Sequence, residues 1–425
     1  MPLNNQISKI FTDLNLYDSK IEGVFKTTHL DKLIHNAFTS PHIERTGLGY
    51  YPEEMVKSYM LGILFNVESQ PDLISTIREN EVFSKECGFN DYIPVQSTFS
   101  RAFNNELYHN PLDLLINNIQ KLIALKKVHK YSDINPIIMN AISKGYLPTS
   151  IDGSLVSLSE KKFNYTTRGY SGSKKKSVPG AKLFLSLDAG TSIPINYDIG
   201  TGKTHESSVI DPLVKEIKDK NLKNFETSLE TTLTLLILSD KGFWKQKRFK
   251  DWNEEQIKFI IPLKRNSFKN LYPNLNEELK SGNENRDWTI NIPGNPTPLR
   301  IVREFTGRNN KKKWFLLTNV WNMTINDIIN LYKQRWIIET VFKWYKEYLN
   351  LESPLGTSWN AFIFHIYCVI ALWTILLYFL TLLGVPAWQE NLQNIRRQLV
   401  NGEKHCWDFY SLGISLDLIE EFFDK

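Results

Sequence analysis

One segment in the C-terminal part of the chain most restricts how the protein can fold. From Ala361 to Val385 the sequence contains no Lys, Arg, Asp or Glu. A helix of about 25 apolar residues either crosses a bilayer or lies in the centre of a large core. This segment contains His365 and lacks a cluster of Lys or Arg close to either end. These features favour a buried core helix, and a membrane span is the alternative.

The length and composition are sufficient for such a core. The chain has 425 residues, of which 42% are hydrophobic and 23% charged, which is typical of a folded protein with two or three structural units. Cys87, Cys368 and Cys406 lie far apart, so neither a disulfide framework nor a zinc ribbon is expected. The first residues show no apolar secretion signal. We therefore expect a cytoplasmic protein that has no membrane partner.

The distribution of basic residues is more informative than the net charge of +5. Three segments are rich in Lys and Arg: residues 161–182, 241–265 and 300–313. The first contains no acid and includes Lys174, Lys175 and Lys176 in succession. A single cluster of this kind is usually a solvated surface, but three in one half of a chain favour a polyanionic partner. We expect the three consecutive lysines to contact the DNA backbone.

The N-terminal third is predicted to be helical. Pro52 is a typical first residue of a helix, Asp72 is a possible cap for a second helix, and a third is expected from Gln96. Short helices separated by turns suit either a DNA-binding unit or a packing and dimerisation unit. The pattern alone does not distinguish these two functions.

The middle of the chain changes to short apolar runs bounded by Gly and Pro. The expected strands are 149–158, 182–190, 193–200, 232–240 and 257–264, with helices expected from Ser207 and over 243–252. The order β-β-β-α-β-α-β, with acids on the first and fourth strands, is that of ribonuclease H. A β-rich insertion is expected over 266–322.

A long helix over roughly 325–348 is predicted next. Tyr332, Arg335, Glu339 and Lys346 follow one another at intervals that place them within about 60° on one helical face. A lone Glu beside Arg and Lys is usually a surface ion pair. Here, however, two candidate strand-end aspartates precede it, Asp152 in I-D-G-S and Asp240 in S-D-K-G-F. Each aspartate by itself is compatible with a simple turn.

Taken together, these motifs resemble a known family. The pattern Y-x2-R-x3-E-x6-K, preceded by the two aspartate motifs, is similar to the DDE transposases of bacterial insertion sequences, in the group with a β-rich insertion before the Glu. The resemblance covers roughly residues 148–385. It implies that Asp152, Asp240 and Glu339 are the catalytic, metal-binding triad. It also implies that Tyr332, Arg335 and Lys346 contact DNA near the reacting phosphate.

The chemistry of phosphodiester cleavage requires the same residue types. In-line displacement at phosphorus is served by two divalent ions, and carboxylate oxygens are the ligands that Mg²⁺ prefers. We therefore expect two Mg²⁺ ions, for which Mn²⁺ is a substitute. The expected partners are double-stranded DNA, as insertion-sequence ends and as target, and a second copy of the chain on that DNA. A nuclease without strand transfer and a catalytically silent DNA-binding descendant are the alternative functions.

Several other residues compete for roles in the site. Asp188 also ends a predicted strand, and His205 follows another, although structural roles are expected for both. Trp288, Trp314 and Trp336 are candidates for stacking on an unpaired base, with core packing the simpler role for each.

The expected architecture is α/β, with a ribonuclease H-like catalytic domain. We divide the chain into a helical N-terminal region, a catalytic domain with its insertion, and a helical C-terminal tail, over residues 1–145, 146–385 and 386–425.

Overall fold

The computed structural model describes most of the chain between residues 50 and 382. The described residues are 34, 37–38, 50–89, 92–127, 135–172, 174–229, 231–264, 279, 284–306 and 312–382. The predicted tail over 386–425 lies outside them. The chain forms two compact units: residues 1–123, 160–165 and 344–425 make the first, and 124–159 and 166–343 make the second. Our division at residues 145 and 385 stays a prediction.

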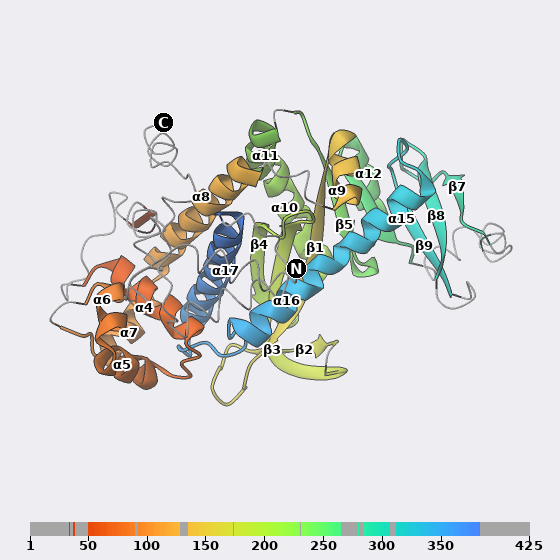
Figure 1. Cartoon of the computed structure of the whole chain (residues 1–425). Helices are drawn as coiled ribbons and strands as arrows, with labels where there is room; N and C mark the ends of the chain where they lie inside the picture. The colour runs from red at the N-terminus through yellow and green to blue at the C-terminus, as the bar shows by residue number, and fades with distance from the viewer. Residues whose placement is uncertain are drawn as a thin grey trace. The chain divides into compact units, whose positions relative to one another are not determined.

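The first unit is helical in its described part (Figure 1). Its helices are α4 (Pro52–Leu64), α5 (Gln70–Glu79), α6 (Glu81–Cys87), α7 (Gln96–Phe103), the 3-10 turn η1 (Glu106–Tyr108), most of α8 (His109–Lys127) and α17 (Trp359–Leu382). Pro52 begins α4 and Gln96 begins α7, as expected. The cap of α5 is Ser69 rather than Asp72, because the Ser69 hydroxyl accepts the Asp72 N–H.

The apolar segment forms α17, the core helix of this unit. Its most apolar stretch, Trp359–Tyr378, has a mean hydropathy of 2.1 and is 89% buried. Phe364 packs on Tyr59 of α4 and Phe103 of α7, with ring centroids 4.9 and 5.3 Å apart. This burial favours the core-helix interpretation over a membrane span. Helix α17 packs with the N-terminal helices, whereas we had expected it in the catalytic domain.

The second unit is built on one mixed sheet. Its strands are β1 (Tyr146–Ser157), β2 (Thr167–Ser171), β3 (Lys176–Asp188), β4 (Pro194–Thr201), β5 (Thr234–Ser239), β6 (Lys258–Pro262), β7 (Arg286–Ile290), β8 (Leu299–Thr306) and β9 (Lys312–Thr318). The hydrogen-bonded order is β2-β3-β1-β5-β6-β9-β8-β7, with β4 also paired to β3. Strands β1, β3 and β4 pair antiparallel, whereas β1, β5 and β6 run parallel. An α/β architecture is thus confirmed.

Strands β7, β8 and β9 fall in the segment expected to be a β-rich insertion. They pair antiparallel with one another, and β9 pairs antiparallel with β6. These strands therefore continue the sheet rather than forming a separate one.

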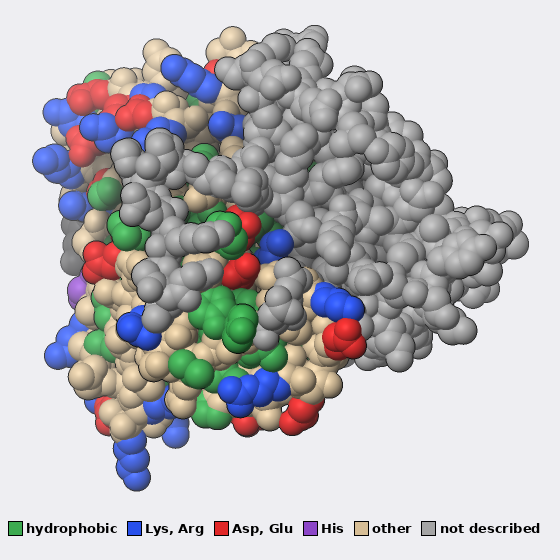
Figure 2. All heavy atoms as spheres, turned by 90° about the vertical axis from the view of Figure 1, so that its left-hand side faces the viewer, with side chains coloured by type: hydrophobic (Ala, Val, Ile, Leu, Met, Phe, Trp, Pro, Cys, Tyr) green, Lys and Arg blue, Asp and Glu red, His purple; other side chains and the backbone are tan. Residues whose placement is uncertain are grey.

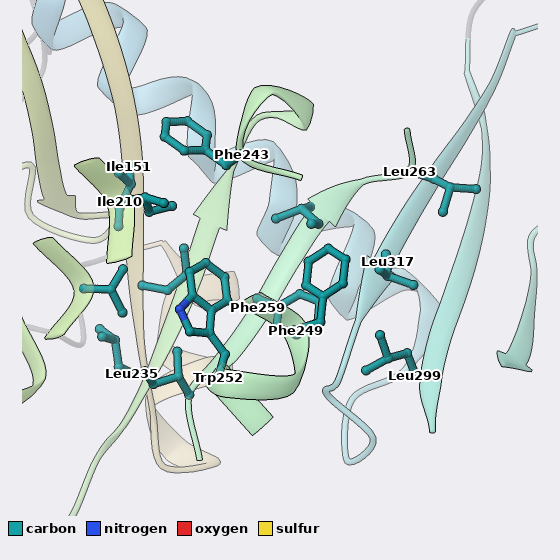
Figure 3. Close-up of a cluster of buried hydrophobic side chains, with 14 of the residues drawn as sticks. Ile151, Ile210, Leu235, Phe243, Phe249, Trp252, Phe259, Leu263, Leu299 and Leu317 are labelled. Atoms are coloured by element: carbon teal, nitrogen blue, oxygen red, sulfur yellow. The ribbon is translucent and has the colours of Figure 1, made fainter. Parts of the chain in front are cut away.

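Helices cover both faces of the sheet. On one face lie α10 (Glu206–Glu216), the π-helical turn η3 (Ile217–Asn221), α11 (Leu222–Leu229) and α12 (Gln246–Glu254). On the other face lie α9 (Pro136–Ser143) and α15 (Ile325–Lys333). Each face of the sheet packs with its helices into a hydrophobic core. Figure 3 shows the first core, on the α10–α12 face, where Phe249 of α12 stacks on Phe259 of β6 with ring centroids 5.0 Å apart and Trp252 packs beside them.

The two cores show which way each strand residue points. Leu235 and Ile237 of β5 enter the first core, whereas Leu236 and Leu238 enter the second. This alternation is the period of two expected of a strand that is buried on both faces.

The predicted long helix is interrupted. Helix α15 is capped by Thr324 and Asp327, as expected, and ends at Lys333. A 3-10 turn, η6 (Gln334–Trp336), then separates it from α16 (Ile337–Tyr348). The break lies at Arg335, within the four-residue signature, and short 3-10 stretches inside helices often occur at functional positions.

Candidate active site

Asp152 and Asp240 are placed side by side by the register of two parallel strands. In that register Ile151 of β1 faces Ser239, the last residue of β5. Asp240 directly follows β5, whereas Asp152 lies inside β1, which continues to Ser157, and not at a strand end as expected. Since side chains alternate, Asp152 points to the same face as Tyr146, and Asp240 to the same face as Leu238. Tyr146 and Leu238 both belong to the core beneath α15. The two carboxylates therefore lie at one end of the sheet on the face covered by α15.

Arg335 joins the first aspartate to the glutamate. Its Nη1 donates to Asp152 Oδ2 at 3.3 Å, and its Nη2 donates to Glu339 Oε1 at 2.5 Å. The guanidinium side chain is only 12% exposed. The 3-10 turn thus places a buried cation between carboxylates that are distant in sequence. Such a bridge is more specific than the surface ion pair considered from sequence.

The other two signature residues have different environments. Tyr332 is buried, its hydroxyl is 3.5 Å from the Ser239 carbonyl oxygen, and the Arg335 guanidinium lies 5.9 Å from its ring. Tyr332 therefore supports Arg335 and the end of β5. Lys346 lies two helical turns beyond Glu339 on α16, in the residues grouped with the first unit, and pairs with Glu352 at 3.8 Å.

The surroundings of Asp152 favour the neutral form of its carboxyl group. Burial raises the pKa of Asp152 to about 7, although Arg335 and the Gly153 N–H oppose this shift. The negative charges of Asp240 and Glu206 raise the same pKa further. A carboxyl group in such surroundings favours a nearby cation, and perturbed acids of this kind are frequent in functional sites.

The donor chemistry of the site fits divalent cations of the magnesium type. Asp152, Asp240 and Glu339 offer only carboxylate oxygens, and no His or Cys is required. Among the described residues, no three acidic, His or Cys side chains are already arranged to hold a metal ion. Arg335 holds Asp152 and Glu339 in ion pairs. A cation at either carboxylate would compete with this guanidinium.

The basic clusters differ greatly in exposure. Lys174 and Lys175 lie in the exposed turn between β2 and β3, and Lys176 begins β3. In contrast, Arg248 of the second cluster is buried, and so are Arg300 and Arg303 of the third. These three arginines bind Asp211, Asp287 and backbone carbonyl oxygens, so they are structural. Among the residues whose exposure the structure describes, the 161–182 segment retains three consecutive exposed lysines.

The described residues visible in Figure 2 form no second cationic surface. Among the described residues visible there, Lys and Arg side chains are interspersed with Asp and Glu. This mixture leaves the helices of the first unit compatible with either DNA binding or packing.

The competing residues differ in their environments. Asp188 is buried and accepts hydrogen bonds from the Thr191 hydroxyl and the Gly190 N–H, which is the arrangement of a tight turn. His205 is the exposed N-cap of α10. Trp288 is buried beneath Arg303, whereas Trp314 and Trp336 are 39% and 63% exposed. Trp336 is therefore the most accessible of the three tryptophans.

The site thus belongs to an α/β protein that presents acidic residues from two parallel strands and one helix. Comparison with known proteins agrees with this class. Residues 143–375 match the transposase DDE domain family, and residues 17–105 match the transposase domain (DUF772). Because the first match covers more than half of the sequence, the chain belongs to the transposase DDE domain family. The resemblance seen in the sequence motifs is therefore confirmed.

Two curated relatives are transposases by name. A probable transposase for insertion sequence element IS5377 from Geobacillus stearothermophilus is 24% identical over 189 residues, or 43% of this chain and 45% of the relative. A putative transposase for insertion sequence element IS4SA from Synechocystis sp. is 26% identical over 198 residues, or 45% of this chain and 51% of the relative. The chain matches about half the length of each of these relatives.

Proposed function

We propose that the protein is a DNA transposase that cleaves the ends of an insertion sequence and joins them to target DNA. The observation that carries the proposal is the shared register of β1 and β5, which brings Asp152 beside Asp240 on the face where Arg335 meets Glu339. Family membership supports DNA as the substrate. In this proposal the three carboxylates are the catalytic triad.

The proposed fold of the catalytic part is ribonuclease H-like. Three antiparallel strands, β1, β3 and β4, are followed by α10, then by the parallel strands β5 and β6 with α12 between them. This order agrees with the β-β-β-α-β-α-β pattern of the sequence. The β2 strand and the β7–β9 extension are additions to that pattern.

The triad would hold two divalent ions, Mg²⁺ or Mn²⁺, through its carboxylate oxygens. When bound, such ions activate the attacking oxygen and stabilise the leaving oxygen of the phosphodiester. Asp152 belongs to β1 and Asp240 directly follows β5, so two neighbouring strands of the sheet set the positions of these two ligands. Glu339 is held in an ion pair with Arg335, so it would have to leave this pair in order to bind a metal ion.

Cationic residues of the chain would position the DNA. Release of one Arg335 ion pair frees guanidinium N–H groups for a phosphate oxygen, and guanidinium groups bind phosphate in a bidentate manner. Lys346 offers a second cation on α16, and Tyr332 holds Arg335 in place. Lys174, Lys175 and Lys176 extend the contact to backbone phosphates away from the cleaved bond. A second copy of the chain would hold the other DNA end.

The test is a reaction of the full chain with duplex DNA that carries the flanking ends of its own element, with Mg²⁺ and a target plasmid. Denaturing gels should show Mg²⁺-dependent nicks at the ends, and joined products should appear with the target. Nicks without joined products would instead identify a nuclease. The absence of both, with DNA binding intact, would identify a silent DNA-binding descendant.

A further inference from the structure

We propose that Glu206 is a fourth carboxylate of the divalent-cation centre, beside Asp152 and Asp240. This inference rests on the proposed function and adds one residue to its site. Glu206 is the first residue of α10, the helix that follows β4, and nothing in the signature motifs marks it. Its side chain is 33% exposed, so it is accessible to ions while remaining anchored.

The two glycines that follow the aspartates both face this side chain. A Cβ atom on Gly242, two residues after Asp240, would lie 2.4 Å from Glu206 Oε2. A Cβ atom on Gly153, directly after Asp152, would lie 3.6 Å from Glu206 Cγ. Because Gly242 has no side chain, the Glu206 carboxylate can occupy the space next to it. The Glu206 side chain therefore lies against the turn that follows Asp240 and against Gly153 of strand β1, which is next to Asp152.

The charges around Glu206 leave it available for a cation. Among the described residues its one ion pair is with Lys182, whose Nζ is 3.7 Å from Oε1, beyond normal hydrogen-bond distance. Lys182 instead donates to the Thr204 carbonyl oxygen at 2.9 Å. The Asp240 carboxylate accepts only the Lys241 N–H among the described residues. The carboxylates of Glu206 and Asp240 therefore have few partners among the described residues.

A buried arginine fixes Glu206 relative to the Asp240 loop. Arg248 of α12 donates from Nη2 to the Ser207 carbonyl oxygen at 2.6 Å and from Nη1 to the Phe243 carbonyl oxygen. It also binds Asp211 of α10, with Nε 2.5 Å from Oδ1. Its side chain has no exposed surface. Arg248 therefore joins the first turn of α10 to the 3-10 turn η4 (Lys241–Phe243), which directly follows Asp240.

Simpler roles for Glu206 lead to different expectations. An acid in the first turn of a helix interacts favourably with the helix dipole, and a partner of Lys182 forms a surface ion pair. Either role predicts a small effect on stability and no effect on metal affinity. A role in the cation centre predicts that metal affinity changes while stability and DNA binding stay close to wild type.

The experiment measures Mn²⁺ binding to the full chain by calorimetry, without DNA. Glu206→Gln should weaken Mn²⁺ binding about tenfold or more, as is usual for groups next to a metal site, and Glu206→Asp should recover part of the loss. Gly242→Ala pushes the carboxylate away without removing its charge, so it should also weaken binding. The matched control is Glu216→Gln at the other end of α10, where the carboxylate binds Lys220 and Asn196. This control should bind Mn²⁺ as the wild type does.

Nicking of end-bearing DNA over a range of Mg²⁺ concentrations gives the second measurement. Glu206→Gln should shift the half-maximal Mg²⁺ concentration upward by a similar factor. Wild-type Mn²⁺ affinity and an unshifted Mg²⁺ curve for Glu206→Gln would overturn the inference. Asp152→Asn, run in parallel, separates this failure from a failure of the proposed function: full nicking by Asp152→Asn would reject the site itself.

Discussion

Protonation of the buried His365 should destabilise the helical unit in acid. His365 Nε2 is 3.0 Å from the Asn350 carbonyl oxygen, which can only accept, so Nε2 carries the proton. Nδ1 then accepts the Tyr59 hydroxyl at 3.1 Å. Burial lowers the pKa of His365 to about 4 from an ordinary value of 6.5. The folded protein therefore keeps this imidazole neutral at pH values where the unfolded chain protonates it.

The direction and size of the effect follow from that difference in pKa. The stabilisation is complete above about pH 6.5 and is lost as the pH falls toward 4, because only the unfolded chain gains a proton over that interval. At about 1.4 kcal/mol per pKa unit, the loss between pH 7 and pH 4.5 is on the order of 2.5 kcal/mol. His365→Gln removes the titrating group and should remove this part of the pH dependence.

Urea unfolding followed by circular dichroism, at several pH values over that interval, measures the effect. The difference in unfolding free energy between wild type and His365→Gln should shrink by that amount as the pH falls. The control is His205→Gln, because His205 is exposed and its removal should leave the pH dependence unchanged. If the unfolding free energies of wild type and His365→Gln differ by the same amount at every pH, the reasoning is refuted.

Two further predictions concern DNA and the apolar helix. Replacing Lys174, Lys175 and Lys176 with Ala should weaken binding to all DNA sequences alike and reduce the slope of log K against log salt by about 0.9 for each lost phosphate contact. An unchanged slope would make this turn an ordinary solvated surface. Because α17 is buried, the intact protein should stay in the supernatant after lysis and ultracentrifugation. Recovery only in detergent-solubilised membranes would contradict the core-helix interpretation.

The parts of the fold that the sequence predicted are those with strong periodic signals. Strand β5 was found because Leu235 to Leu238 are buried on both faces, and such strands read as continuous apolar runs. Strand β2 was missed because T-R-G-Y-S contains no apolar run. This strand pairs with β3, and Gly169 in it allows the chain to approach Gly202 closely, since a Cβ there would lie 2.4 Å from the Gly202 carbonyl oxygen. Tertiary packing, which local sequence does not reveal, determines that strand.

The candidate site was predicted to a similar extent. Two aspartates in strand contexts and a glutamate on an amphipathic helix are visible in sequence, although Asp152 lies within β1 and not at its end as expected. Their roles stay predictions. The interruption at Arg335 was not visible, because the periodicity of the helix continues across it. Glu206 carries no local signal either, since its position depends on the buried Arg248 and on space next to Gly242. Burial of Arg248, Arg300 and Arg303 also shows why clusters of basic residues in sequence overestimate a cationic surface.

The central claim is that three carboxylates from separate elements form one catalytic centre. The most direct measurement is Mg²⁺-dependent nicking of an end-bearing duplex by Asp152→Asn, Asp240→Asn and Glu339→Gln, each alongside a gel-shift titration. Each variant keeps the size of the side chain and removes the charge that binds the ions, so nicking should be abolished while DNA affinity stays close to wild type. Wild-type nicking by any one of these variants would remove that residue from the centre and contradict the claim.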